Sequence, residues 1–231
     1  MSDEFPQELQ AWKPTCSADI FGMRFRTRRL LQEFFGKQGY LEVETPLLSH
    51  DVVVDSHLEP FAVHTGNKTL PMYLQTSPEA GMKRLLAADS GSIFQVTRSF
   101  RKGEQGRRHN SEFTMVEWYG VETTYHDQMQ LTEDLVRSVA IVVADWHSEQ
   151  TSPPLIPTQL PRQPFSRTSY DTAFQMAASG VLDLSAAELQ TLAEQHTSIG
   201  NTAQQITDRD DLLNLLLAEC VEPNLGKPRP Q

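Results

Sequence analysis

Apolar residues recur with two different periods in the first part of the chain. Between Ser17, an N-cap candidate, and Phe34 they recur at helical spacing, which predicts an amphipathic helix. Gly36 and Gly39 are expected to end this helix. In the segment YLEVETP at positions 40–46, apolar and acidic side chains alternate, as is typical of a half-buried strand closed by its proline.

Two longer alternating segments flank a polar loop. SIFQVTRSFR at 92–101 and EFTMVEWYGVE at 112–122 are each expected to form a strand, and together they predict an antiparallel hairpin closed by the loop 102–111. Side chains of a strand alternate between its two faces. The returning strand therefore places four residues on one face, namely Phe113, Met115, Glu117 and Tyr119. The other face carries Thr114, Val116 and Trp118.

Helix signals mark the remaining segments. PMYLQTSPEAGMKRLLAAD at 71–89 predicts a strand that continues into a helix. In that helix Ser77 is a candidate cap, Pro78 suits the first helical position, and Glu79 suits the positive end of the helix dipole. Further helices are expected at about 125–143, 169–180, 185–196 and 208–220.

Composition divides the chain into three parts. Residues 1–16 form a polar leader, and residues 17–150 carry most of the strand and helix patterns. Residues 151–231 begin with a linker or surface excursion, because the stretch 151–166 contains five prolines, and they continue with helical segments.

Charge and cysteine content exclude several classes of protein. A chain of 231 residues with 39% hydrophobic residues and a net charge of −10 is expected to be globular, without general affinity for nucleic acids or membranes. Cys16 and Cys220 are too few for a disulfide framework, and no histidine lies at metal-ligand spacing, so no metal ligands are expected in this chain. Neither a signal peptide nor a membrane-spanning run is present, so we expect a cytoplasmic protein.

The hairpin carries the residues with candidate chemistry. A carboxylate and a phenol, Glu117 and Tyr119, share a strand face with large apolar side chains, and a buried carboxylate is costly unless it meets a cation or hydrogen-bond donors. This face therefore suits a cationic ligand. Arg101 ends the first strand, where a guanidinium can bind phosphate oxygens, and Asn110 can bind a base or a ribose.

Each of these features also has a purely structural interpretation. The basic loop, with Lys102, Arg107, Arg108 and His109, is also explained as a solvated hairpin loop. Glu117 is equally explained as a paired residue at the edge of a sheet. The start of the helix at 77–79 needs no ligand to account for its residues.

Several motifs nevertheless resemble a known family. FRKGEQGRRHNSEFTMVEWY at 100–119 is similar to the second signature motif of class II aminoacyl-tRNA synthetases, in the form found in the lysyl branch. FFGKQGYLEVETPLLS at 34–49 resembles the first signature, which forms the dimer interface and ends at Pro46. The resemblance extends through HLEPF and TSPEAGMKRLL to DRDDLLNLLLAECVEPNLGKP, and within the lysyl branch it is greatest to the elongation factor P–(R)-β-lysine ligases.

This resemblance implies an α+β fold, with an antiparallel sheet flanked by helices. Residues 17–150 would form the N-terminal part of the catalytic domain, and residues 151–231 a proline-rich linker and helical insertion of the same domain. The resemblance also implies an activity and its site residues. It implies that ATP activates (R)-β-lysine, or lysine, as an adenylate, with Mg²⁺ as cofactor, and that the acyl group passes to a lysine of elongation factor P. It implies contacts to ATP from Arg101, Lys102, Gly103 or Glu104, and Asn110, with Arg101 as the catalytic residue. It implies substrate contacts from Ser77, Pro78, Glu79 and Tyr119, to which the strand alternation adds Glu117. A homodimer is implied, and contact with a tRNA anticodon is not.

The chain also departs from the family pattern. Gly103 stands where a glutamate is usual, Ser111 where a proline is usual, and Gly120 where the ligases tend to have arginine. Ala80 and Gly81 replace bulkier residues beside the expected substrate site. The third signature and the acidic residues expected to hold Mg²⁺ are missing, so the catalytic domain is expected to be incomplete at its C-terminus. A lysyl-tRNA synthetase fragment and a non-catalytic dimerising module therefore stay open as alternatives.

Overall fold

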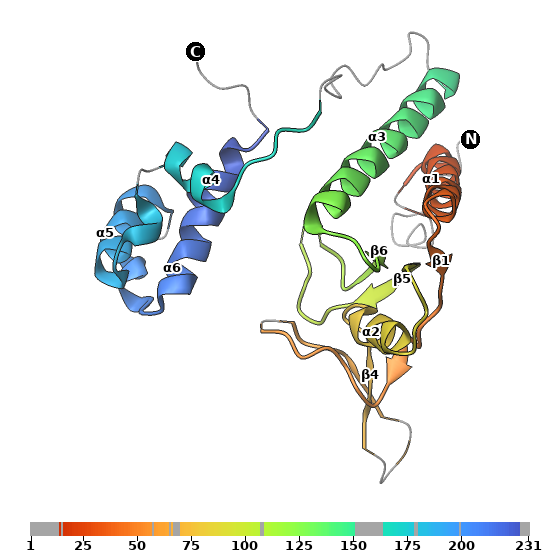
Figure 1. Cartoon of the computed structure of the whole chain (residues 1–231). Coiled ribbons are helices and arrows are strands. Elements are labelled where there is room, and N and C mark those ends of the chain that lie inside the picture. Colours follow the sequence, from red (N-terminus) through yellow and green to blue (C-terminus); the bar gives the residue numbers. More distant parts are fainter. Residues whose placement is uncertain are drawn as a thin grey trace, which may run out of the picture. The chain divides into compact units, whose positions relative to one another are not determined.

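The computed structural model describes residues 14, 16–56, 58–64, 66, 70–106, 109–150, 164–177, 180–198 and 200–226. They belong to two compact units, Met1–Gln163 and Pro164–Gln231, and each unit is considered by itself (Figure 1). The proline-rich segment 151–163, the leader residues 1–13 and the loop residues 107–108 lie outside the described residues.

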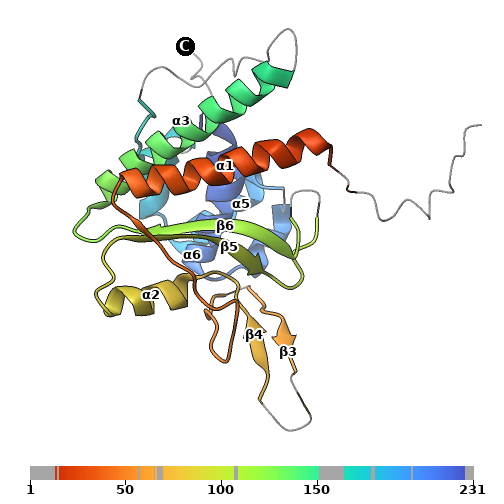
Figure 2. The same cartoon turned by 90° about the vertical axis from the view of Figure 1, so that its right-hand side faces the viewer.

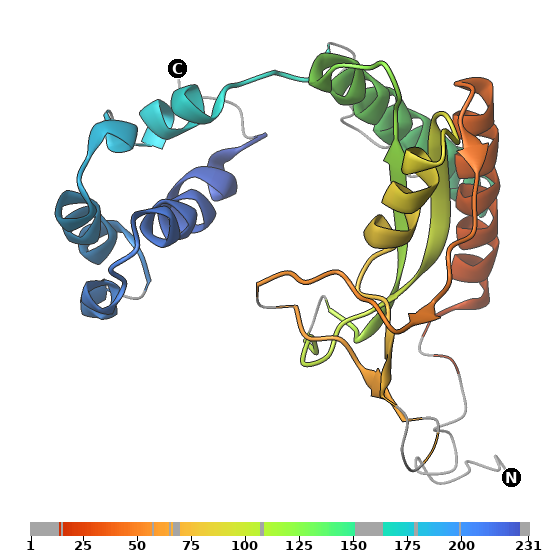
Figure 3. The same ribbon diagram turned by 60° about the horizontal axis from the view of Figure 1, so that its bottom comes forward.

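The first unit is built on a three-stranded sheet with helices on both faces. The elements that form it are α1 (Ala18–Lys37), β1 (Leu41–Glu42), α2 (Glu79–Ala87), β5 (Ile93–Phe100), β6 (Glu112–Tyr119) and α3 (Tyr125–Gln150). The strand order is β1-β5-β6, with β1 parallel to β5 and β5 antiparallel to β6. Helices α1 and α3 cover one face of the sheet and α2 lies on the other (Figures 2 and 3). The expected α+β fold is thereby confirmed.

The core of this unit lies between the sheet and the helix pair α1 and α3. Phe35 of α1 is fully buried, and its ring stacks on Phe94 of β5 at a centroid distance of 4.7 Å. The ring of Trp118 in β6 is 5.3 Å from the ring of Phe35. Because Phe94 and Trp118 are direct cross-strand partners, the face of the hairpin that carries them forms the interior, and the opposite face is left for other contacts.

A polar cluster at the end of β6 ties the hairpin to α3. The side-chain amide of Gln128 donates hydrogen bonds to the hydroxyls of Tyr40 at 3.2 Å and Thr123 at 2.9 Å, and its oxygen accepts one from the indole N–H of Trp118 at 2.8 Å. A Cβ atom at Gly120 would lie 2.3 Å from this amide nitrogen. The glycine at position 120 is therefore explained by the space that this cluster needs.

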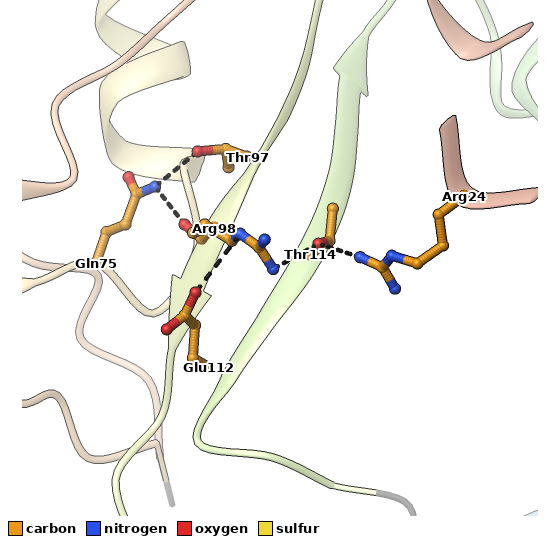
Figure 4. Close-up of polar contacts among 6 residues, drawn as sticks. All are labelled: Arg24, Gln75, Thr97, Arg98, Glu112 and Thr114. Carbon is orange, nitrogen blue, oxygen red and sulfur yellow. Dashed lines mark hydrogen bonds and ion pairs between the residues drawn. The ribbon is translucent and has the colours of Figure 1, made fainter. Parts of the chain in front are cut away.

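A second, smaller sheet supports the hairpin from below in Figure 2. It consists of β2 (Leu48–Ser49), β3 (Ala62–Val63) and β4 (Met72–Leu74) in the antiparallel order β2-β4-β3. Just after β4, the side chain of Gln75 donates to the backbone carbonyl of Arg98 at 2.9 Å (Figure 4). The backbone carbonyl of Gln75 accepts a hydrogen bond from the backbone N–H of Phe100. These bonds fix the segment that leads into α2 against β5.

Three local expectations for this unit were wrong in detail. Helix α1 continues through Gly36 to Lys37, so Gly36 does not end it, but Gly39 does, with a φ of 80° and a backbone N–H that donates to the carbonyl of Gly36. The side chain of Ser17 makes no capping hydrogen bond. Strand β1 has only two residues and Leu41 is 59% exposed, so the expected half-buried strand is short and exposed. Helix α3 extends well beyond residue 143, because Trp146 packs under Arg26 of α1, with 4.7 Å between the guanidinium carbon and the ring.

The second unit is a small helical assembly with its own core. Its longer helices are α4 (Tyr170–Ala177), α5 (Ala186–His196) and α6 (Arg209–Leu216). Helix α6 continues into a π-helical turn, η4 (Leu217–Val221). The shorter turns are η2 (Val181–Asp183), η3 (Gly200–Gln205) and η5 (Glu222–Asn224). Phe174, Leu189 and Leu212 are almost completely buried in it. The three predicted helical segments are therefore confirmed. No helix among the described residues of either unit is long and apolar enough to span a membrane.

Candidate functional site

One face of the hairpin is free of α1 and α3 and carries polar groups. Phe113, Met115, Glu117 and Tyr119 alternate with the core residues of β6, so they lie on the side of the sheet where α2 is found. All four side chains are half-buried. The sequence prediction that these residues share a face agrees with the register of the hairpin, in which Glu117 is opposite Gln95 and Tyr119 opposite Ile93.

Glu117 and Tyr119 form a hydrogen-bonded pair on this face. The phenol donates to a carboxylate oxygen of Glu117 at 2.7 Å. Burial raises the pKa of the Glu117 carboxyl above its usual range, while the hydrogen bond from Tyr119 opposes this shift. Burial, and then the hydrogen bond to Glu117, also raises the pKa of Tyr119, so its hydroxyl stays a proton donor at neutral pH. A partly desolvated carboxylate of this kind is well suited to an ammonium ligand.

Arg101 is held at the mouth of the hairpin on the same face. Its guanidinium carbon lies 5.1 Å from the centre of the Phe113 ring, and Nε donates to the carbonyl of Thr76 at 3.4 Å. Nη1 lies 3.7 Å from a carboxylate oxygen of Glu104. Because Phe113, Glu117 and Tyr119 occupy alternate positions of one strand, the guanidinium, the carboxylate and the phenol are all on one side of the sheet.

The loop that follows Arg101 carries the other residues expected to contact a nucleotide. Lys102 forms an ion pair with Glu59, and the two residues also form an isolated antiparallel bridge, so this lysine is anchored to the segment before β3. Gly103 has a φ of 82°, a conformation that favours glycine, which explains why no glutamate stands there. The acidic side chain at Glu104 instead pairs with Arg101. Asn110 is exposed.

The start of α2 borders the same face. Pro78 occupies the N-cap position, one residue later than expected for a cap at Ser77, whose hydroxyl accepts a hydrogen bond of 3.4 Å from the backbone N–H of Glu79. The Glu79 carboxylate forms an ion pair with Lys83 one turn further on. Thr76 is fully buried, and its hydroxyl has no hydrogen-bond partner among the described residues.

Close packing places α2 against the segment between β1 and β2. A Cβ atom at Gly81 would lie 2.8 Å from the Cβ of Thr45, so a glycine is needed at this contact. The backbone N–H and the hydroxyl of Thr45 both donate to Oε1 of the buried Gln95, at 3.3 and 3.0 Å. The small residue at position 81 is therefore explained by helix packing against Thr45.

The opposite face of the hairpin has a different arrangement of charge. Arg24 of α1 and Arg98 of β5 both donate to the hydroxyl of Thr114, at 3.3 and 3.0 Å, and Arg98 also lies 3.5 Å from a carboxylate oxygen of Glu112 (Figure 4). These arginines are on the side of α1, so they are separated by the sheet from Arg101 and Glu117.

Together, the α2-facing side of the hairpin and the start of α2 carry the guanidinium of Arg101, the phenol of Tyr119 and three carboxylates, those of Glu79, Glu104 and Glu117. A guanidinium binds phosphate or carboxylate oxygens, and carboxylates bind ammonium groups. Among the described residues, no group of three or more His, Cys, Asp or Glu side chains gathers that would hold a metal ion. The described residues therefore do not by themselves form a Mg²⁺ site.

Comparisons with known proteins identify the family of this chain. The family model for class II tRNA synthetases (D, K and N) matches residues 9–216. Two relatives, each named elongation factor P–(R)-β-lysine ligase, come from Haemophilus influenzae (strain PittGG) and Salmonella gallinarum; they are 38% identical over 228 and 229 residues. The matches cover 96% of this chain but 63% and 64% of the relatives, so the chain spans less than two thirds of their length.

Proposed function

The chain belongs to the family of class II tRNA synthetases (D, K and N), and we propose that it carries part of the active site of an ATP-dependent ligase that attaches (R)-β-lysine to elongation factor P. In this reaction a carboxylate oxygen of the amino acid attacks the α-phosphorus of ATP, and pyrophosphate leaves. A lysine amine of the acceptor protein then attacks the acyl carbon, an amide bond forms, and AMP leaves. We also propose a cytoplasmic homodimer that makes no contact with a tRNA anticodon.

The observation that carries the proposal is the placement of Arg101, Glu117 and Tyr119 on one side of the sheet. A reaction between a triphosphate and an amino acid needs a cation for the phosphate and an anion for the amine at a short separation. Arg101 stacks on Phe113, four residues before Glu117 in the same strand, and this spacing supports both roles.

Each remaining residue has a role that follows from its position. Lys102, Gly103 and Asn110 border the nucleotide, and Glu104 holds the guanidinium of Arg101 until phosphate oxygens replace its carboxylate. Ser77, Pro78 and Glu79 border the amino acid at the start of α2. No side chain acts as nucleophile, so the residues work by orientation and by neutralising charge at the α-phosphate. No step is assigned to Mg²⁺, since the described residues do not form its site.

The test is the substitution Arg101→Ala, with Arg98→Ala as the matched control. Both changes remove one guanidinium from the same hairpin, but Arg98 points to the face of Thr114. We expect Arg101→Ala to lower binding of ATP by at least about tenfold, and pyrophosphate exchange by about a hundredfold where exchange is measurable. Arg98→Ala should change both by less than about threefold. Equal effects of the two substitutions would remove Arg101 from the mechanism.

The same assays separate the proposal from its alternatives. Pyrophosphate exchange with L-lysine but not with (R)-β-lysine would identify the site as that of a lysyl-tRNA synthetase. Tight self-association without binding of ATP would favour a non-catalytic dimerising module. Exchange that depends on (R)-β-lysine, followed by labelling of elongation factor P, is the outcome that we expect.

A further inference from the structure

Two arginines from different elements converge on one hydroxyl on the α1-facing side of the hairpin. Nη2 of Arg24 in α1 lies 3.3 Å from Oγ1 of Thr114 in β6, and Nη1 of Arg98 in β5 lies 3.0 Å from the same oxygen (Figure 4). A hydroxyl carries no charge, so these two hydrogen bonds leave both positive charges without compensation. These three residues are called the two-arginine cluster.

The two-arginine cluster presents hydrogen-bond donors that have no acceptor. A threonine hydroxyl has two lone pairs and one proton. Both arginines donate to the oxygen of Thr114, so its lone pairs are occupied, and its proton meets no acceptor among the described residues. Each guanidinium keeps further N–H groups beyond the one that binds Thr114. Three elements of the fold therefore direct donors at one place, which is typical of a site for an oxyanion.

A single carboxylate compensates part of the charge. Nε of Arg98 lies 3.5 Å from Oε1 of Glu112, and both of these side chains are about half exposed. At this distance the contact is too long for a strong hydrogen bond, so Glu112 can be displaced by a ligand. Within the part of the chain that the structure describes, no carboxylate pairs with Arg24. Two guanidinium groups and one carboxylate give a local charge of +1 in a chain whose net charge is −10.

The backbone of the cluster is already held in place. Arg98 and Thr114 are direct cross-strand partners in the hairpin. The side chain of Gln75 donates to the backbone carbonyl of Arg98 at 2.9 Å, on the far side of β5 from the guanidinium (Figure 4). A ligand therefore has only side chains to reorient, which keeps the entropic cost of binding low.

We propose that Arg24, Arg98 and Thr114 bind a phosphate group on the side of the sheet opposite to Arg101. A phosphate group offers at least three oxygens to the three donor side chains, whereas a carboxylate offers only two. A free phosphate ion and a phosphate monoester share this chemistry. The inference does not depend on the proposed function, because the sheet separates this site from Arg101, and loss of the site should leave nucleotide binding there unchanged.

The experiment is a titration of the 231-residue protein with inorganic phosphate at low ionic strength, followed by NMR at the backbone N–H of Thr114 and at Nε–H of Arg24. Glu112→Gln removes the internal competitor and should raise the affinity by about threefold. Arg24→Gln removes a donor and should lower it by about fivefold. The matched controls are Glu33→Gln and Arg29→Gln, which remove the same kinds of charge from an exposed pair at 3.3 Å within α1. Both controls should leave the affinity unchanged.

The gain of affinity in Glu112→Gln cannot be produced by a protein that fails to fold. If phosphate shifts no signal at Thr114, or if Glu112→Gln does not bind it more tightly, the inference is wrong. Acetate is the carboxylate probe, and binding of acetate as tight as that of phosphate would also overturn the proposal. Methyl phosphate separates the two sources of the ligand: binding of both phosphates supports a monoester, and binding of inorganic phosphate alone supports the free ion. Arg101→Ala should leave the signals of Thr114 unchanged, so failure of this site and failure of the proposed function are distinguishable.

Discussion

The substitution Gly120→Ala tests the polar cluster at the end of β6. An added Cβ would lie 2.3 Å from Nε2 of Gln128, 2.6 Å from the hydroxyl of Thr123 and 2.7 Å from the hydroxyl of Tyr40. All three distances are too short for a carbon atom, so the amide of Gln128 must move, and its hydrogen bond from Trp118 weakens or breaks. The backbone at Gly120 is not in the positive-φ region, so steric conflict is the only penalty.

The magnitude follows from two opposing contributions. Forced overpacking costs about 1–3 kcal/mol, and each weakened hydrogen bond costs about 1 kcal/mol. Replacing glycine by alanine also stabilises the folded state by about 0.4–1 kcal/mol, because it lowers the conformational entropy of the unfolded chain. We therefore expect a net loss of about 2 kcal/mol, which for a unit of this size lowers Tm by about 4–8 °C.

The assay is urea and thermal unfolding followed by tryptophan fluorescence. The three tryptophans, at positions 12, 118 and 146, all belong to the first unit, so the signal reports that unit alone. Gly36→Ala is the matched control, because no atom lies within 4 Å of its added Cβ and the residue is inside α1, where alanine should stabilise by about 0.5–1 kcal/mol. A Gly120→Ala variant as stable as the unaltered protein would refute the role of this cluster.

Two further predictions concern single side chains. Burial raises the folded-state pKa of Glu117 above its unfolded value, so the contribution of Glu117 to stability is present at low pH and is lost as pH rises through the folded pKa. Glu117→Gln should therefore raise Tm at pH 7 by more than it does near pH 4.5. A difference in Tm that does not vary with pH would contradict this. Asp208 accepts hydrogen bonds from the backbone N–H groups of Asp210 and Asp211 at the start of α6, so Asp208→Ala should destabilise the second unit by about 1 kcal/mol. That loss should appear in circular dichroism, whereas a change in the fluorescence transition would show that the two units unfold together.

The hairpin was predictable from the sequence because its information is local. Each strand alternates over eight residues, and the face that holds Glu117 and Tyr119 follows from that period alone. The end of α1 was predictable in part, because Gly39 takes the left-handed conformation that ends many helices, with a φ of 80°. Gly36 was also expected to end the helix, but it stays helical next to the buried Phe35.

The partners of the site residues were less predictable than the residues themselves. Arg101 is marked by its place at a strand end, but its stacking on Phe113 and its pairing with Glu104 depend on how the loop folds. Gly81 indicates only a weak position inside a helix when it is considered in the sequence. Its close contact with Thr45, which places the start of α2 against the segment before β2, is indicated by no local pattern.

The two-sided hairpin has a consequence for how this protein can vary. On β6, Trp118 and Val116 fill the interior, while their immediate neighbours Glu117 and Tyr119 point to the other side. Neighbouring residues of β6 therefore have different functions, and a mutation that alters ligand binding need not disturb folding. Related proteins that share this ribbon can exchange ligands by changing every second amino acid and keep the same scaffold.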